Sequence, residues 1–424
     1  MYIYIAKSGD TMEKIAAENG VDAVLLREWN GIKGNIPAVG QSILILSPDI
    51  IHTVRAGESI SSIAADYGIS TRRLLAYNPS QNGGYTPLYE GQKIVISFSE
   101  KSQGRMEING YAYPFIEEEI LLYGLPYLTY IAPFTYGFTP AGTLVSLDDE
   151  NIISAAQSYG VKPLMHLSTL TKDGNFSNEL ASALLGNAAA RKNLISACIS
   201  NMQNKGYTGM DIDFEFIYPS DAAAYASFIA EMRAAANPQG FDVTAALAPK
   251  TSASQNGLFY EGHDYAAIGA AADKIFVMTY EWGYTYGPPM AVAPINSVRR
   301  VLDYAVSEIP AGKIFMGMPN YAYDWILPYK KGETRATLIS NEAAAETALQ
   351  YGAEIKFDEE AQTPYFNYTA DGNAHEVWFE DARSISSKLA LIPEYGLAGA
   401  GYWNMMRKFN QNWMIAAVAY GAFS

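Results

Sequence analysis

The chain has 424 residues, of which 49% are hydrophobic and 17% charged, a composition typical of globular proteins with enough apolar material for a core. Its formal net charge of −15 argues against polyanionic partners, nucleic acid above all, because phosphate binding requires clustered lysine and arginine. The single cysteine, Cys198, excludes an intramolecular disulfide, and no apolar run is long enough to cross a membrane.

The chain starts with residues 1–6, Met-Tyr-Ile-Tyr-Ile-Ala, which lack the positive, apolar and cleavage regions of a secretory signal. We therefore expect a protein made in the cytoplasm without a signal peptide, with no membrane partner and no obligate protein partner. Another route could still carry it to a target outside the cell.

One sequence pattern occurs twice, in residues 1–47 and again in residues 50–97. Each copy has a β-branched run, a glycine–acid–hydroxyl turn suited to starting a helix, a second helical stretch and a closing strand, and this order predicts two βααβ modules. The recurring residues, 48 positions apart, are Gly9, Asp10, Thr11 and Asn30 in the first copy and Gly57, Glu58, Ser59 and Asn78 in the second.

These repeats resemble the LysM module, which binds the N-acetylglucosamine backbone of peptidoglycan or chitin. The resemblance implies that the recurring residues of both copies contact glycan and that the pair serves targeting and avidity. The alternative for Asn30 and Asn78 is that they cap turns, as asparagine often does.

Residues 98–104 are polar and indicate a linker, and residues 105–424 alternate between strand-like and helix-like segments. Eight strands with intervening helices predict an α/β fold, a (β/α)8 TIM barrel. An open doubly wound sheet is the competitor, weakened because no glycine-rich phosphate loop follows an early strand. The expected strands are 107–112, 127–133, 162–166, 209–214, 242–246, 274–279, 313–318 and 397–402, and the expected helices include 149–159, 189–204, 221–236 and 295–308.

The connection after the seventh strand is too long for an ordinary loop. Residues 321–380 include a helical piece at 341–351 and strand-like pieces at 354–357, 363–368 and 376–379. We expect an α+β insertion that deepens one wall of a groove at the catalytic end of the barrel.

Three acids alternate along the fourth strand, so Asp211, Asp213 and Glu215 share one face while Met210, Ile212 and Phe214 share the other. Crowded carboxylates resist desolvation, and folds accept such a face mainly where the acids do chemistry. Repulsion from Asp213 and partial burial should raise the pKa of Glu215 and keep it protonated as a general acid. The alternative is an edge strand with a solvated acidic face.

This strand resembles the signature of glycoside hydrolase family 18, Asp-x-x-Asp-x-Asp-x-Glu at the end of the fourth barrel strand. Residues 208–215 match it except that Thr208 stands at the first acidic position, a change that the resemblance implies would retune Asp211. Met278-Thr279-Tyr280 resembles the family's Met-x-Tyr, and Trp403 takes the place of its pocket-floor tryptophan. Glu281 stands where chitinases usually have Asp.

The resemblance implies substrate-assisted retention, with Glu215, Asp213, Asp211 and Tyr280 as catalytic residues and no metal or organic cofactor. Glu215 would protonate the leaving oxygen, and Asp213 would steady the acetamido group, with Asp211 sharing its proton network. Tyr280 would donate a hydrogen bond to the acetamido oxygen. His166 is expected to be hydrogen-bonded structure. The expected substrate-binding residues are Trp403, Met278, Glu281, Trp282 and Tyr321, with Trp325 as a further candidate that packing explains equally well.

Two LysM-like modules before such a barrel resemble the bacterial spore cortex-fragment lytic enzymes, which are N-acetylglucosaminidases. The expected substrate is therefore peptidoglycan or another N-acetylglucosamine polymer, and the expected place is the coat or cortex surface of the spore. A chitinase or chito-oligosaccharide hydrolase is the second enzyme hypothesis. A catalytically silent glycan-binding protein is the rival from another class, and the intact Glu215 argues against it.

Overall fold

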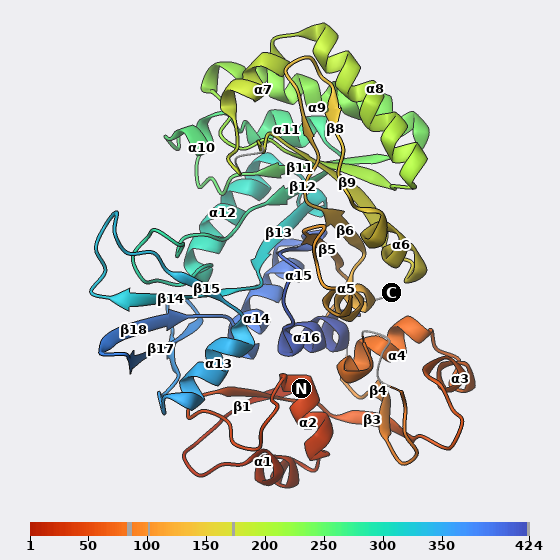
Figure 1. Ribbon diagram of the computed structural model, residues 1–424, viewed down its shortest axis with the longest axis vertical. Coiled ribbons are helices and arrows are strands. Elements are labelled where there is room, and N and C mark those ends of the chain that lie inside the picture. The colour runs from red at the N-terminus through yellow and green to blue at the C-terminus, as the bar shows by residue number, and fades with distance from the viewer. Residues whose placement is uncertain (83–86, 101, 172–173, 422–424) are drawn as a thin grey trace.

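A computed structural model describes residues 1–82, 87–100, 102–171 and 174–421 (Figure 1). Residue 101 of the predicted linker and residues 422–424 of the predicted barrel domain lie outside the described residues. The chain forms two small N-terminal modules, a barrel and an insertion in that barrel.

Both N-terminal modules have the predicted βααβ order. Module 1 consists of β1 (Tyr2–Ile5), α1 (Met12–Asn19), α2 (Ala23–Asn30) and β2 (Ser42–Ile45), and module 2 of β3 (Pro48–Thr53), α3 (Ile60–Asp66), α4 (Thr71–Tyr77) and β4 (Lys93–Phe98). In each module the two strands pair antiparallel. The hydroxyls of Thr11 and Ser59 accept from the backbone N–H three residues on and so cap α1 and α3.

The recurring asparagines pin helix to strand inside each module. Asn30 donates to the Leu26 and Leu44 carbonyls and accepts from the Leu44 N–H at 2.7 Å. Asn78 makes the equivalent three bonds in module 2. Both side chains are buried, so the expectation that they contact glycan is corrected: their hydrogen-bonding groups are used within the protein.

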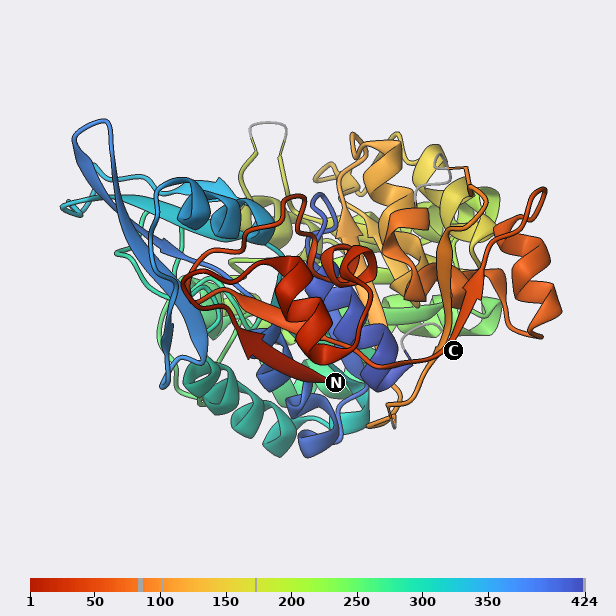
Figure 2. The same ribbon diagram turned by 90° about the horizontal axis from the view of Figure 1, so that it is seen from below.

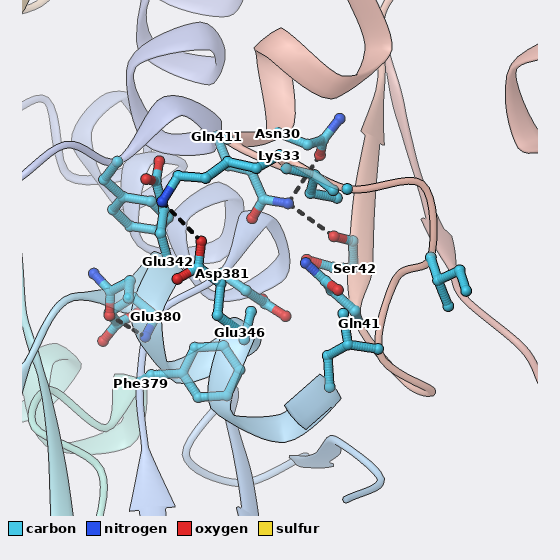
Figure 3. Close-up of a pocket in the computed structure, with 18 residues that line it drawn as sticks. Asn30, Lys33, Gln41, Ser42, Glu342, Glu346, Phe379, Glu380, Asp381 and Gln411 are labelled. Carbon is cyan, nitrogen blue, oxygen red and sulfur yellow. Dashed lines mark hydrogen bonds and ion pairs between the residues drawn. The ribbon is translucent and has the colours of Figure 1, made fainter. Parts of the chain in front are cut away.

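Asn30 also takes part in the contact between module 1 and the barrel. Gln411 Nε2 donates to Asn30 Oδ1 at 2.9 Å and to the Ser42 carbonyl at 2.8 Å. Figure 2 shows module 1 lying against α16 (Asn410–Tyr420), and Figure 3 shows Gln411 reaching both partners. Module 1 is therefore hydrogen-bonded to the barrel at a buried position.

We expect Asn30→Ala to lower the free energy of unfolding by about 1–3 kcal/mol, because buried partners lose their hydrogen bonds. The matched variant Asn78→Ala should cost a similar amount within module 2 without loosening the barrel contact. Urea unfolding followed by circular dichroism measures both. An Asn30→Ala chain that unfolds at the same urea concentration as the unchanged chain would contradict this structural role of Asn30.

The predicted eight-stranded parallel barrel is confirmed, and it is closed, which excludes the open sheet. The strands lie in the spatial order β10-β11-β12-β13-β19-β5-β6-β9. The second strand starts three residues later than predicted, because residues 125–127 with Pro126 form a 3-10 turn. The strands are β5 (Glu107–Ala112), β6 (Tyr130–Pro133), β9 (Lys162–Ser168), β10 (Gly209–Asp213), β11 (Asp242–Leu247), β12 (Lys274–Val277), β13 (Ile314–Pro319) and β19 (Gly399–Trp403).

Helices surround the barrel (Figure 1). The last one, α16, is buried on all sides over residues 411–420 because the barrel covers one face and α2 and α4 of the modules lie against the other. Among the described residues, no helix combines the length and apolarity that crossing a bilayer requires. The ring includes α5 (Glu118–Gly124), α6 (Glu150–Ser158), α7 (Asn178–Leu185), α8 (Ala188–Lys205), α9 (Ala222–Ala236), α11 (Tyr265–Ala271), α12 (Ile295–Glu308), α14 (Ala382–Leu389) and α15 (Leu391–Tyr395), with the short α10 (Leu258–Glu261) at its edge.

The insertion after the seventh strand combines strands and one helix, as predicted, and its strands form an antiparallel sheet. The helix is α13 (Asn341–Gln350), and two strands of the sheet, β14 and β15, were missing from the prediction. The spatial order is β15-β14-β18-β17-β16. The strands are β14 (Ala322–Leu327), β15 (Thr337–Ile339), β16 (Lys356–Asp358), β17 (Thr363–Ala370) and β18 (Asn373–Trp378).

Candidate active site

The acidic strand β10 is one of the eight strands of the closed barrel and pairs with β9 on one side and β11 on the other. Its apolar face packs outward, where the Phe214 ring stacks on Tyr225 and Phe228 of α9. Its acidic face points inward, and Glu215 follows two residues after the strand ends at Asp213. An edge strand with a solvated acidic face is therefore excluded.

A cavity of about 490 Å³ opens at the carboxyl ends of the strands, a size typical of ligand sites. Aromatic and apolar side chains form most of its wall, and Asp213, Glu215 and Glu281 supply its carboxylates. Its lining residues are Tyr111, Tyr113, Phe134, His166, Leu170, Gly174, Phe176, Asp213, Glu215, Ala246, Pro249, Phe259, Tyr260, Phe276, Met278, Tyr280, Glu281, Trp282 and Trp403.

Asp211 lies below the cavity and is fully buried. Tyr111 donates its hydroxyl to Asp211 Oδ2 at 2.7 Å. His166 Nε2 lies 3.9 Å from Asp211 Oδ2 and 3.6 Å from Asp213 Oδ2, so it stands between the two carboxylates. Desolvation raises the pKa of Asp211 to about 6, against the opposing effects of His166 and the Tyr111 hydroxyl.

Glu215 faces the cavity from the end of the acidic strand. Burial raises its pKa well above the usual range, and the charges of Asp213 and Glu281 raise it further. A carboxyl group in this environment holds its proton near neutral pH and can deliver it to a bound ligand. The site therefore places Glu215, as a proton donor, beside the carboxylate of Asp213.

Tyr280 and Trp403 close the floor of the cavity. Thr279 Oγ1 donates to the Gly317 carbonyl at 2.7 Å and fixes the backbone before Tyr280. A Cβ on Gly317 would lie 2.7 Å from the Tyr280 ring, so glycine is required at this close approach. The Trp403 ring packs edge-on against Phe134, with centroids 4.8 Å apart.

The insertion contacts the site indirectly, through hydrogen bonds to Glu281. Tyr321 donates its hydroxyl to Glu281 Oε1, and Tyr323 donates to the same oxygen at 3.4 Å. No described residue of the insertion lines the cavity, so the expectation that it forms a wall is corrected. Tyr321 is buried behind Glu281, in place of the expected contact with sugar, and Trp325 is buried and donates to the Gly287 carbonyl.

Comparison with known families and proteins decides what this barrel is. The model of "Glycosyl hydrolases family 18" matches residues 93–407, and the LysM domain model matches residues 4–46 and 52–97. The chain belongs to glycosyl hydrolases family 18. It is 43% identical to the cortical fragment-lytic enzyme of Bacillus subtilis (strain 168) over 291 residues, which are 68% of this chain and 67% of that one.

Two solved structures of related proteins superimpose on this family 18 chain. The spore cortex-lytic enzyme SleL of Bacillus megaterium QM B1551 superimposes with a TM-score of 0.83 and 36% identity, covering 99% of this chain and 97% of that one. A chitinase of Chromobacterium violaceum ATCC 12472 superimposes with a TM-score of 0.68 and 25% identity, covering 75% of this chain and 98% of that one. The first likeness includes the N-terminal modules, and the second covers three quarters of the chain.

The departure from the family 18 signature lies away from the carboxylates. Thr208 precedes β10, and its hydroxyl donates to the Pro163 carbonyl at 3.0 Å. Thr208 and Asp211 are three positions apart, about 10 Å along an extended strand, and the Thr208 hydroxyl is bonded to Pro163, so Thr208 is not the hydrogen-bond partner of that acid. Asp211 instead has its partner in Tyr111.

Two residues near the family 18 site, Tyr111 and His263, belong to no sequence motif that predicts their roles. Tyr111 lies 100 positions before Asp211. His263 is buried, accepts the Ala248 N–H at Nδ1 and therefore donates from Nε2 to the Phe214 carbonyl at 3.0 Å. It fixes the backbone between Asp213 and Glu215, and burial lowers its pKa, which favours the neutral ring. A lone histidine on a loop does not reveal this role in the sequence.

An aromatic track leaves the cavity floor beside β5. Tyr113 contacts Trp403 and stacks on Phe115 with centroids 5.2 Å apart and planes at 18°. Phe115 is 76% exposed, the highest fraction among the exposed large apolar side chains of the described residues, so its ring face is open to a ligand. The track suits sugar rings beyond the reacting one.

We expect Phe115→Ala to raise KM for N-acetylglucosamine hexasaccharide roughly two- to tenfold, because one aromatic contact is worth about 0.5–1.5 kcal/mol. The KM for an aryl glycoside of the disaccharide should rise less than the KM for the hexasaccharide, because a shorter ligand makes fewer contacts along the track. Initial-rate measurements on both substrates check this. Ile326→Ala, which removes an exposed apolar side chain of β14 away from the cavity, is the control, and an equal effect of both variants would contradict the track.

Proposed function

We propose that this family 18 enzyme hydrolyses β-1,4 bonds after N-acetylglucosamine in peptidoglycan, with retention and with help from the substrate. The observation that carries the proposal is Glu215, a carboxyl group held protonated by burial and by the charges of Asp213 and Glu281 at the edge of an aromatic cavity. Such an acid is the proton donor that cleavage of a glycosidic bond requires.

In the first step Glu215 gives its proton to the glycosidic oxygen, and the carbonyl oxygen of the substrate's own 2-acetamido group attacks the anomeric carbon. The bond between that carbon and the leaving oxygen breaks, which yields an oxazolinium ion and a free hydroxyl on the departing sugar. In the second step water attacks the anomeric carbon and transfers a proton to Glu215. The acetamido group is restored and the configuration is retained.

Asp213 stabilises the positive charge that develops on the acetamido nitrogen, because a buried carboxylate interacts strongly with a nearby cation. Asp211 shares the proton network below it through His166 and Tyr111. Tyr280 donates to the acetamido oxygen and holds it for attack. Burial raises the pKa of the Tyr280 hydroxyl well above its usual range, so it stays a donor.

We propose fragments of the spore cortex as the physiological substrate. The support is the likeness to the cortical fragment-lytic enzyme of B. subtilis and, over both modules and the barrel, to SleL. The same likeness favours a location at the spore coat or cortex surface. The LysM modules would bind the N-acetylglucosamine chain, and their turns at Gly9–Thr11 and Gly57–Ser59 remain proposed contacts.

Parallel digestion of purified cortex fragments and chitin oligomers tests the substrate. Mass spectrometry of the products should show muropeptides ending in reducing N-acetylglucosamine, with slower turnover of chitin. Faster turnover of chitin oligomers than of cortex would favour a chitinase. Binding to both polymers with turnover of neither would identify a silent glycan-binding protein.

A further inference from the structure

Module 1 carries a cavity that the module does not form alone. The turn after β1, residues 7–11, and the loop before β2, residues 36–39, line a space of about 320 Å³. Its third side comes from the end of α13 in the barrel insertion. The contributing residues there are Ala348, Leu349, Gly352 and Ala353.

The backbone holds this third side in place. The Ile355 N–H donates to the Val39 carbonyl at 2.9 Å. A Cβ on Gly40 would lie 2.0 Å from the Ile355 carbonyl oxygen, so the two backbones meet at a distance that only glycine allows. Lys33 of the module also lies 3.1 Å from Glu346 of α13, measured from Nζ to Oε1, so these contacts fix α13 relative to the module. The bonds from Gln411 hold the same module to α16 (Figure 3).

The cavity combines exposed apolar side chains with free backbone donors. Ile36 is 58% exposed and Leu349 is 42% exposed, one from each side of the opening. The N–H groups of Gly9 and Val39 make no hydrogen bond within the described part of the chain. Asp10 is occupied by Tyr4, Lys14 and the Lys7 N–H, so it offers no free carboxylate.

These groups suit an uncharged ligand that has apolar ring faces and carbonyl acceptors, which describes an N-acetylated sugar. We propose that α13 is the third wall of the glycan site of module 1, so that a bound N-acetylglucosamine chain contacts the barrel insertion as well as the module. The inference rests on the proposed function in assigning N-acetylglucosamine glycan as the ligand. It makes module 1 a glycan site only while it is docked on the barrel.

Module 2 is placed differently. Its α3 points away from the insertion, whereas α13 lies beside module 1 (Figure 1). Its loop at residues 87–90 exposes Tyr89 at 63%, an aromatic face for sugar that needs no partner element. The composite wall therefore fixes the direction of a glycan relative to the barrel at module 1, and module 2 adds avidity.

The test follows methyl signals of full-length Glu215→Gln, which cannot consume the ligand, during titration with N-acetylglucosamine tetrasaccharide. Signals of Ile36 and Leu349 report the composite cavity, Leu170 reports the catalytic cavity and Leu88 reports module 2. We expect the signals of Ile36 and Leu349 to move with one common midpoint. Leu349→Asp should weaken the Ile36 response at least fivefold and leave the Leu170 midpoint unchanged, whereas Leu349→Met should bind normally.

A shift of Ile36 without Leu349, or an Ile36 midpoint that Leu349→Asp leaves unchanged, would overturn the inference, because module 1 would then bind alone. A response of Leu88 alone would also overturn it. The exposed position of Leu349 makes unfolding of the variant unexpected, and a thermal melt checks this. Hydrolysis of cortex without a shift at Ile36 rejects only the composite site, and the shift without hydrolysis by the unmodified enzyme rejects only the proposed reaction.

Discussion

Glu215→Gln should lower kcat on cortex fragments by at least about 10²–10⁴-fold, the range that general acid catalysis contributes. The amide has nearly the shape of the acid but no proton to give, so the leaving oxygen would depart as an unprotonated alkoxide. Binding should persist, because the aromatic walls and Asp213 are unchanged. Initial rates measure the first effect, and calorimetric titration with the tetrasaccharide measures the second.

Glu281→Gln is the matched control, since both glutamates line the same cavity. Tyr321 and Tyr323 occupy one oxygen of Glu281, and a glutamine oxygen can accept the same bonds. We expect this variant to lose much less activity than Glu215→Gln. If Glu215→Gln retained N-acetylglucosaminidase activity, or if Glu281→Gln lost as much, the assignment of the acid would be wrong.

Local patterns in the sequence were sufficient to predict the modules and the barrel. The alternation of acids with Ile212 and Phe214 predicts a strand with one apolar face and one acidic face, because successive side chains of a strand point to opposite sides. The glycine–acid–hydroxyl turns identified two helix starts, because the cap is made within four residues. Each of these features depends on neighbours in the chain.

The parts that were missed depend on residues far apart in the chain. The sequence leaves Asn30 either in contact with glycan or capping a turn, yet one of its partners, Gln411, lies 381 positions away. The place of Tyr321 after a strand predicts a contact with sugar, whereas its hydroxyl donates to Glu281, 40 positions away in the chain. Tyr111 reaches Asp211 across the barrel. Sequence spacing alone does not state which side chains a closed barrel brings together.

Asp213→Asn should lower kcat by about 10²–10³-fold, the loss typical of removing one preorganised electrostatic partner of a transition state. The amide oxygen of the substituted side chain could still accept a hydrogen bond from the acetamido N–H, but the amide carries no charge to oppose the positive charge of the oxazolinium ion. KM should change little, because the ground-state acetamido group is neutral. Rates on the disaccharide aryl glycoside separate kcat from KM.

The same variant should change the pH profile in a defined direction. Burial is the main cause of the raised pKa of Glu215, and the charge of Asp213 is the second. Activity requires protonated Glu215, so it is lost as the pH rises through that pKa. Removing the charge of Asp213 lowers the pKa, and the alkaline limb of kcat/KM should therefore move to lower pH. A limb that stays in place, or moves to higher pH, would show that Asp213 does not interact with the acid, and would leave its effect on kcat without this electrostatic explanation.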